Sequence, residues 1–238
     1  MVLNHQEKLR VHTGALKSLP LRQKFPRTKN GVQVDFIHIL VYTGHLDMIE
    51  KLFTTPVYVK DLDLNNKSIY NECIRYQKEI NKKGCTISNR GGYQSPNLLT
   101  SNIPAFDNLA KMIADHVKIY GEYVSLYPKH LKDLWFNINH YKDYNVTHDH
   151  FGEGNKFSGV YYVKTPRNSG VLKLHHPGVR VVDSAWSRYS KQHNEFTSSC
   201  WNYEAKQGRL IIFPSWLEHG VEPNFSKLPR VSFSFNVE

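Results

Sequence analysis

Cysteine is scarce in this sequence of 238 residues. There are three cysteines, Cys73, Cys85 and Cys200, and no two of them form a C-x-x-C pair. A small, odd set argues against a disulfide framework and against a thiolate zinc site. We therefore expect a reducing compartment, the cytoplasm, or the host cytoplasm if the chain is viral.

Long hydrophobic runs are also lacking. The longest, FIHILVY at residues 36–42, is interrupted by a histidine and is far shorter than the about 20 residues that a transmembrane helix needs. Polar residues at positions 4–7 occupy the place where a signal peptide would have its apolar stretch. The sequence therefore predicts no membrane partner and no secretion.

Acidic residues are outnumbered, with 21 Asp and Glu against 31 Lys and Arg, a formal charge of +10. Residues 1–34 contain seven basic residues and one Glu, so +6 lies there and only +4 in the other 204 residues. This segment has few large apolar residues, so we predict a basic, disordered extension at 1–47 or an extended gene start before Met48. A nucleic-acid partner stays open but is not favoured, because most of the charge lies outside the domain predicted at 48–238.

Hydrophobic periodicity divides that domain into a helical part, 48–133, and a β part, 134–238. Helical spacing of apolar residues predicts helices at about 65–83 and 105–123. After residue 134, short apolar runs alternate with Gly, Pro and Asn, which is typical of strands and turns. The predicted strands are 134–141, 144–150, 156–164, 170–175, 208–214 and 230–237. We expect a mainly β fold with N-terminal helices, a jelly roll or barrel backed by the helices.

An H-x-H triplet, His148-Asp149-His150, is the strongest chemical signal. Side chains at i and i+2 of an extended chain point to one face, so both imidazoles can converge on one metal ion. A third histidine, His219, follows 69 residues after His150. With 13 histidines in the chain, two solvated histidines at a strand end remain the alternative.

The C-terminal strand alternates strictly between apolar and polar residues. One face carries Val231, Phe233, Phe235 and Val237, and the other carries Arg230, Ser232, Ser234 and Asn236. This pattern fits an ordinary strand with its polar face in water. In a closed barrel, the same polar face would place an arginine beside the metal, where its planar fork can bind a carboxylate.

Several segments together resemble the iron(II)/2-oxoglutarate-dependent dioxygenases. They are Ser88–Ser95, Trp135–Asn139, His148–His150, Ser158–Val163, Gly208–His219 and Arg230–Asn236. The resemblance spans Met48–Glu238 and is strongest to a branch common among phages and marine bacteria. It implies a double-stranded β-helix that uses Fe(II), 2-oxoglutarate and O2 to oxidise an unknown substrate. The reaction that we expect is a hydroxylation.

The resemblance also implies roles for individual residues. His148, His150 and His219 would hold the metal and form the catalytic centre. Arg230 and Ser232 match the family's R-x-S pattern, which binds the distal carboxylate of 2-oxoglutarate. Further candidates for contacting this cosubstrate are Asn137, Asn139 and Tyr162. The two asparagines fit equally well as residues that form hydrogen bonds with backbone groups in the core.

One position departs from the family pattern. His150 stands where the family has Asp or Glu, so the site lacks one negative charge and should bind Fe(II) more weakly. A turn at Asp149 would restore a carboxylate ligand and is the alternative. The departure also leaves open a non-catalytic, metal-binding jelly-roll module that binds a ligand or partner, and the net charge leaves open an oxygenase acting on nucleic acid. The sequence predicts neither the substrate nor the oligomeric state.

Overall fold

The structure, a computed structural model, describes residues 50–152, 154–186 and 189–238. The extension predicted at 1–47 lies outside this part of the chain. Residues 51–238 form one compact unit. No helix in the described ranges is both long and apolar enough to cross a membrane.

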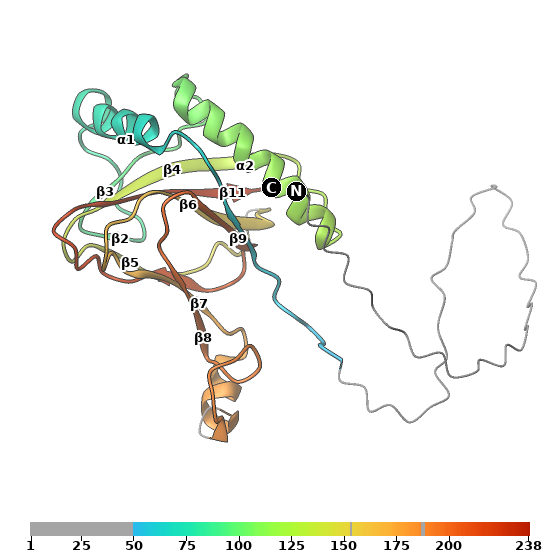
Figure 1. Cartoon of the computed structure of the whole chain (residues 1–238). Helices are drawn as coiled ribbons and strands as arrows, with labels where there is room; N and C mark the ends of the chain where they lie inside the picture. The colour runs from blue at the N-terminus through green and yellow to red at the C-terminus, as the bar shows by residue number, and fades with distance from the viewer. Residues whose placement is uncertain (1–49, 153, 187–188) are drawn as a thin grey trace, which may run out of the picture. The chain divides into compact units, whose positions relative to one another are not determined.

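Two antiparallel sheets form a double-stranded β-helix, as the sequence predicts (Figure 1). The larger sheet has the order β1-β9-β6-β11-β4-β3, and the smaller has the order β2-β5-β10-β7-β8. The strands are β1 (Tyr58–Asp61), β2 (Asn89–Arg90), β3 (Tyr93–Gln94), β4 (Leu131–Asn139), β5 (Tyr144–His148), β6 (Phe157–Lys164), β7 (Val171–His175), β8 (Cys200–Glu204), β9 (Arg209–Pro214), β10 (His219–Val221) and β11 (Arg230–Val237). The short strands β1, β2, β3, β8 and β10 were not predicted as strands.

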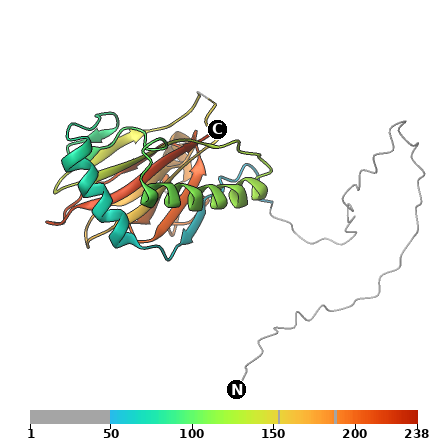
Figure 2. The same ribbon diagram turned by 90° about the horizontal axis from the view of Figure 1, so that it is seen from above.

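Both predicted helices are present. α1 (Asn66–Arg75) continues into a π-helical turn, η1 (Tyr76–Ile80), and α2 covers Pro104–Tyr123. α1 begins where the Asn65 side chain accepts a hydrogen bond from the Ser68 amide at 3.1 Å, and α2 begins at a proline, whose fixed φ suits a first turn. Figure 2 shows both helices on one side of the large sheet.

The main hydrophobic core lies between these helices and the large sheet. Phe106 of α2 contacts Phe136 of β4 and Phe233 of β11, with ring centroids 5.9 Å and 5.3 Å apart. The apolar face of β11 packs on this side, whereas Ser232 and Ser234 face a cavity between the two sheets. The polar face of β11 therefore points into the barrel rather than into water.

A smaller apolar cluster lies between the two sheets. Its buried members are Val160, Tyr162, Leu172, Leu174, Ile211, Phe213 and Leu217. These residues close the barrel on the side of β6, β7 and β9. They leave a polar region between β4, β5, β10 and β11.

Two strand ends differ from the sequence prediction because side chains cap the turns. β4 ends at Asn139 rather than at 141, since Asp143 Oδ2 accepts a hydrogen bond from the His140 amide at 2.7 Å and Lys142 adopts a φ of 70°. β5 ends at His148 rather than at 150. There, Asp149 Oδ1 accepts a hydrogen bond from the Phe151 amide at 3.0 Å and turns the chain.

Two consecutive glycines connect the sheets. Gly91 and Gly92 link β2 of the small sheet to β3 of the large sheet, with φ values of 72° and 64°. A Cβ atom at Gly91 would overlap the Asp143 carboxylate. Only glycine combines this left-handed backbone with so close an approach.

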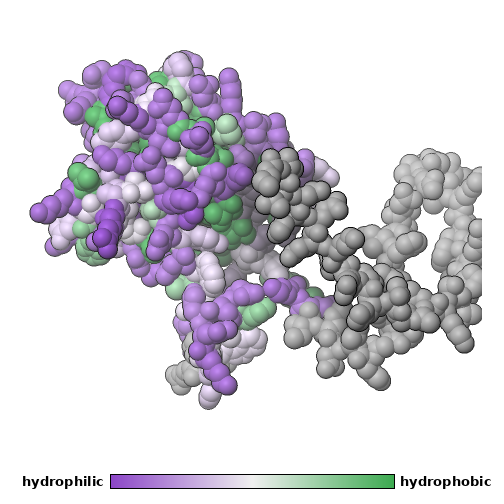
Figure 3. All heavy atoms as spheres, viewed as in Figure 1, coloured by the Kyte–Doolittle hydropathy of each residue, from purple (hydrophilic) through white to green (hydrophobic). Residues whose placement is uncertain are grey.

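The connection between β7 and β8 projects away from the sheets (Figure 1). It contains α3 (Val179–Val181) and η2 (Val182–Trp186). Hydrophilic side chains cover most of the face shown in Figure 3.

Candidate metal centre and ligand cavity

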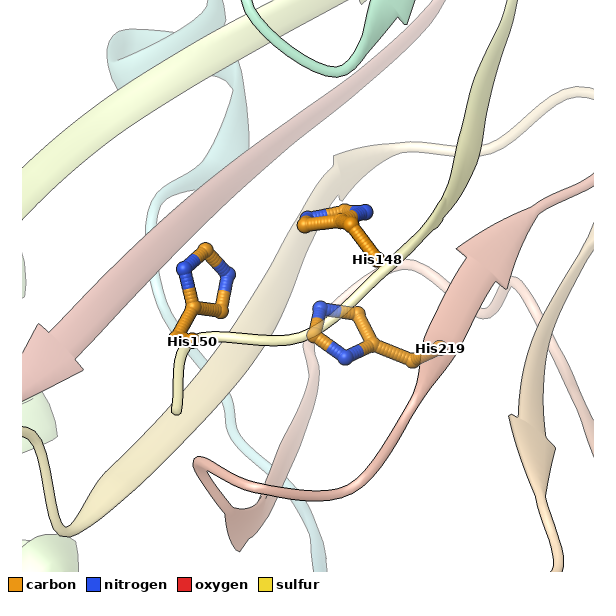
Figure 4. A group of neighbouring side chains, drawn as sticks. All are labelled: His148, His150 and His219. Atoms are coloured by element: carbon orange, nitrogen blue, oxygen red, sulfur yellow. The ribbon is translucent and has the colours of Figure 1, made fainter. Parts of the chain in front are cut away.

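Three histidines from two neighbouring strands meet at one point. His148 is the last residue of β5, His150 follows two residues later, and His219 is the first residue of β10. In the antiparallel pairing, His219 lies directly opposite His148. Their potential ligand nitrogens all lie within 4.8 Å of one another, and Figure 4 shows the three rings turned toward a common point.

Backbone carbonyls orient two of these rings. His148 Nδ1 is 2.7 Å from the Val146 carbonyl oxygen, and His219 Nδ1 is 2.8 Å from that of Leu217. A carbonyl can only accept, so each Nδ1 carries the proton and each Nε2 has its lone pair available. Burial lowers the pKa of His148, and lowers that of His219 to about 3, which keeps both imidazoles in the neutral, metal-binding form.

The carboxylate of Asp149 lies outside this cluster. Its side chain is exposed and is engaged by the Phe151 amide. Among the residues that the structure describes, the grouped ligands are the three histidines alone. The geometry therefore favours the three-histidine set over the alternative in which Asp149 turns inward.

A polar cavity between the sheets adjoins the histidines. Its lining residues are Ser88, Trp135, Asn137, Asn145, His148, His150, Ser158, Gly159, Val160, Tyr162, Leu172, Phe213, His219, Val221, Ser232, Ser234 and Phe235. Of the predicted cosubstrate residues, Asn137, Tyr162 and Ser232 border this cavity, whereas Arg230 and Asn139 do not. Hydroxyl and amide groups dominate the polar lining, and no Asp or Glu of the described chain contributes to it.

Sequence reasoning missed four polar residues of this lining: Ser88, Asn145, Ser158 and Ser234. Ser234 lies on the face of β11 that also carries Ser232, and Ser158 lies on the face of β6 that carries Tyr162, so strict alternation could have found both. Asn145 could not have been found this way. Between His219 and Val221 the register with β5 shifts from His148 to Asn145, and this bulge brings Asn145 to the cavity.

Arg230 is fully buried and fixed by the backbone. Its Nη1 donates to the carbonyl oxygens of Ser169 and Glu222, the latter at 3.2 Å. Its Nε and Nη2 are buried with no hydrogen-bond partner in the described structure. In the register of β4 and β11, Arg230 lies opposite Asn139, whose buried Oδ1 likewise has no partner there.

Tyr162 lies close to Arg230 along the large sheet, opposite the residue two positions after Arg230 on β11. Tyr162 pairs with Ser232 across β6 and β11, and its hydroxyl is buried without a hydrogen-bond partner among the described residues. Burial raises the pKa of Tyr162 to about 12, so the phenol is neutral, while the nearby Arg230 charge acts in the opposite direction. Buried polar groups are normally hydrogen-bonded, so these orphaned groups point to a polar ligand.

These observations fit a divalent metal ion and a carboxylate-bearing ligand. Neutral imidazoles suit Fe(II) and similar ions. A guanidinium with two unpartnered N–H groups suits a carboxylate, which can accept both of them.

The comparisons with known proteins agree with this chemistry. Residues 133–236 match a family model described as "Putative 2OG-Fe(II) oxygenase". A prolyl-4-hydroxylase from Pseudomonas putida is similar in structure, with a TM-score of 0.58 and 15% identity over 78% of this chain and 93% of that one. No curated protein sequence matches this chain.

Two further solved structures share the fold at low identity. A prolyl hydroxylase from Trichoplax adhaerens, in complex with a hypoxia inducible factor peptide, has a TM-score of 0.56 and 12% identity over 76% of this chain and 82% of its own. HygX from Streptomyces hygroscopicus, with nickel and 2-oxoglutarate bound, has a TM-score of 0.52 and 12% identity over 77% and 83%.

Proposed function

We propose that this protein is an iron(II)/2-oxoglutarate-dependent oxygenase that hydroxylates an organic substrate, a proposal supported by the match of residues 133–236 to the model of that family. Decarboxylation of 2-oxoglutarate to succinate would be coupled to this oxidation. The observation that carries the proposal is the placement of three imidazoles beside a polar cavity, with a buried arginine that has two donors without partners among the described residues.

The metal would be held by Nε2 of His148 and His219, and by a ring nitrogen of His150. The carbonyls of Val146 and Leu217 fix the first two rings before any ion binds, which lowers the entropic cost of assembling the site. Bound Fe(II) and 2-oxoglutarate supply the oxidising chemistry when O2 is present.

Arg230 would bind the distal carboxylate of 2-oxoglutarate through Nε and Nη2. The Ser169 and Glu222 carbonyls hold the other end of the guanidinium, so the two free donors keep a fixed direction. Tyr162 and Ser232, which pair across β6 and β11 two residues beyond Arg230, border the cavity and would donate their hydroxyl protons to the same carboxylate. Asn139 would support Arg230 from the neighbouring strand rather than touch the ligand.

Asn137 lines the same cavity, to which the histidines and the proposed carboxylate-binding residues Tyr162 and Ser232 also contribute. Its Nδ2 is 3.5 Å from Ser234 Oγ, and its Oδ1 is buried with no partner in the described chain. It would orient 2-oxoglutarate from the β4 side. On the opposite side, Leu172 and Phe213 close the cavity with apolar surface, which limits the access of water to the reacting groups.

Hydroxylation is the reaction class that two of the structural neighbours have in their names. Their prolyl and peptide substrates are properties of those proteins. For this chain, residues 151–155 and 178–202 would decide the substrate.

An anaerobic titration tests the proposal. The protein should develop a metal-to-ligand charge-transfer absorption with Fe(II) and 2-oxoglutarate, and form succinate once O2 is admitted. His219→Ala should lose the metal. His175→Ala is the matched control, because His175 lies outside the cluster, with Nε2 3.5 Å from Thr147 Oγ1.

Metal binding without succinate formation, across a broad panel of candidate substrates, would identify a non-catalytic ligand-binding module. The missing carboxylate ligand is the observation that favours this second function. Equal metal loss in His175→Ala and His219→Ala would contradict the ligand set.

A further inference from the structure

The barrel interior contains positive charge with no negative charge to balance it. Every ligand in the metal cluster is a histidine, and the cavity lining includes no Asp or Glu among the residues that the structure describes. Arg230 adds a fully buried guanidinium that forms no salt bridge in the described ranges. Bound Fe(II) and Arg230 would therefore place three positive charges in the barrel interior, where no described Asp or Glu borders the cavity.

Asp143 is the acidic residue whose charge acts on Arg230. Its carboxylate raises the pKa of Arg230, against the larger lowering effect of burial. Asp143 Oδ2, however, already accepts a hydrogen bond from the His140 amide at 2.7 Å, and Asp143 does not border the cavity. It is therefore part of neither the cavity lining nor the histidine cluster.

We propose that the metal ion and a dicarboxylate bind this protein as a mutually dependent pair, with the dicarboxylate supplying the negative charge that the protein does not. The inference rests on the proposed function, because it takes 2-oxoglutarate as the dicarboxylate. The three-histidine set makes the metal affinity conditional on the cosubstrate.

The physical reason is the cost of burying unpaired charge. An uncompensated ion in the interior loses its hydration without gaining a partner. A dianion next to the metal and Arg230 removes most of this penalty, so each ligand should raise the affinity of the other. Thermodynamic linkage requires the two effects to be equal in size.

The experiment measures metal affinity with and without a dicarboxylate, using the full chain. Co(II) serves as a metal that is stable in air, and its visible absorption reports its coordination. N-oxalylglycine serves as a stable analogue that chelates as 2-oxoglutarate does, and glutarate as a dianion without the keto group. Both dianions should tighten Co(II) binding, N-oxalylglycine by about 100-fold, near the upper end of couplings between two sites.

His150→Asp is the decisive variant, because it places a carboxylate at the position of the missing charge. It should bind Co(II) more tightly than the wild type in the absence of dicarboxylate, and the effect of either dianion should fall to about 10-fold or less, toward the lower end of that range. His150→Glu, with a longer reach, provides the same comparison if the shorter side chain fails to meet the metal. Circular dichroism checks that each variant is folded.

Two charge-removing controls are available in the same segment. Asp149→Asn removes the exposed carboxylate next to the cluster and should leave Co(II) affinity unchanged. Glu153→Gln does the same for an acidic residue that the structure does not describe. A loss of metal affinity in either variant would show that the chain supplies its own carboxylate, and would overturn the inference.

The remaining outcomes separate this inference from the proposed function. If the wild type binds Co(II) equally well with and without both dianions, while Fe(II) and 2-oxoglutarate still yield succinate, the inference fails and the proposed function stands. If coupling is equally strong in wild type and both His150 variants, chelation alone explains it and the charge argument is wrong. If no metal binds under any condition, both fail.

Discussion

Replacing Arg230 by methionine separates ligand binding from folding. The variant Arg230→Met keeps a long side chain but removes two buried donors that have no partner among the described residues. A hydrogen bond to a charged group contributes about 1.5–3 kcal/mol, so losing two of them costs about 3–6 kcal/mol of 2-oxoglutarate binding. Because about 1.4 kcal/mol is tenfold in affinity, we expect the Kd to rise at least about 100-fold.

The same substitution should change stability little. It removes the hydrogen bonds from Nη1 to the Ser169 and Glu222 carbonyls, but it also removes a buried cation without a salt bridge, whose desolvation costs several kcal/mol. These two terms have opposite signs and similar size, so the net change in unfolding free energy should stay within about 2 kcal/mol.

The assay is an anaerobic titration of the Fe(II)-loaded protein with 2-oxoglutarate, followed by the charge-transfer absorption, next to urea unfolding of the same variant. Arg230→Lys is the matched control, because lysine keeps the charge but not the planar fork. It should recover part of the affinity. A Kd for Arg230→Met within about threefold of wild type would refute the assignment of Arg230 to the cosubstrate, since even one such hydrogen bond contributes more than that.

Three further changes have distinct expected results. Tyr162→Phe removes a buried hydroxyl without a partner in the described structure; urea unfolding should show equal or higher stability, whereas 2-oxoglutarate affinity should fall about 3- to 10-fold, and a fall in both would indicate a structural role instead. Phe233→Ala empties a fully buried position against Phe106 and should lower the unfolding free energy by about 3–5 kcal/mol, so a loss below about 1 kcal/mol would contradict the core position. Hydrogen bonds from Arg209 and Lys206 lower the pKa of Asp61 to about 2, so the ion pairs stabilise the fold above the usual carboxyl pKa and lose this effect as the pH falls toward 2. Asp61→Asn should therefore lower the free energy of unfolding by about 0.2–1 kcal/mol at pH 7, a small amount because the carboxylate is half exposed. This difference from the wild type should disappear in acid. A difference that stays constant down to pH 2 would exclude the ion pairs as its cause.

The periodicity of apolar residues in the sequence predicted most of the long strands and both long helices. Alternation in β11 and β6, and helical spacing in α1 and α2, follow from the periodicity of each element alone. Their observed bounds lie close to the predicted ranges. Short strands such as β2 and β10 have too few residues to show a period, so only their pairing with neighbouring strands defines them.

Local spacing also predicted part of the candidate site. An i, i+2 pair in extended chain shares a face, which predicted that His148 and His150 converge; the two rings do meet His219, although β5 already ends at His148. Asn145 lies out of phase with this pair. It reaches the cavity through a bulge that depends on the register of β5 against β10.

The sequence by itself determined the composition of the site: three histidines, an arginine on the polar face of a strand, and no carboxylate in the expected place. The two-residue repeat of a strand predicts the histidine pair and the arginine, whereas the inclusion of His219 and the expected place of a carboxylate follow from the resemblance to the dioxygenase family. Only the tertiary structure decided that neither face of β11 meets water, because one face is buried under the helices and the other surrounds a cavity. It also decided that Arg230 keeps two donors unpaired and that Asp149 turns outward, because both depend on backbone groups distant in sequence or on the exact end of a strand.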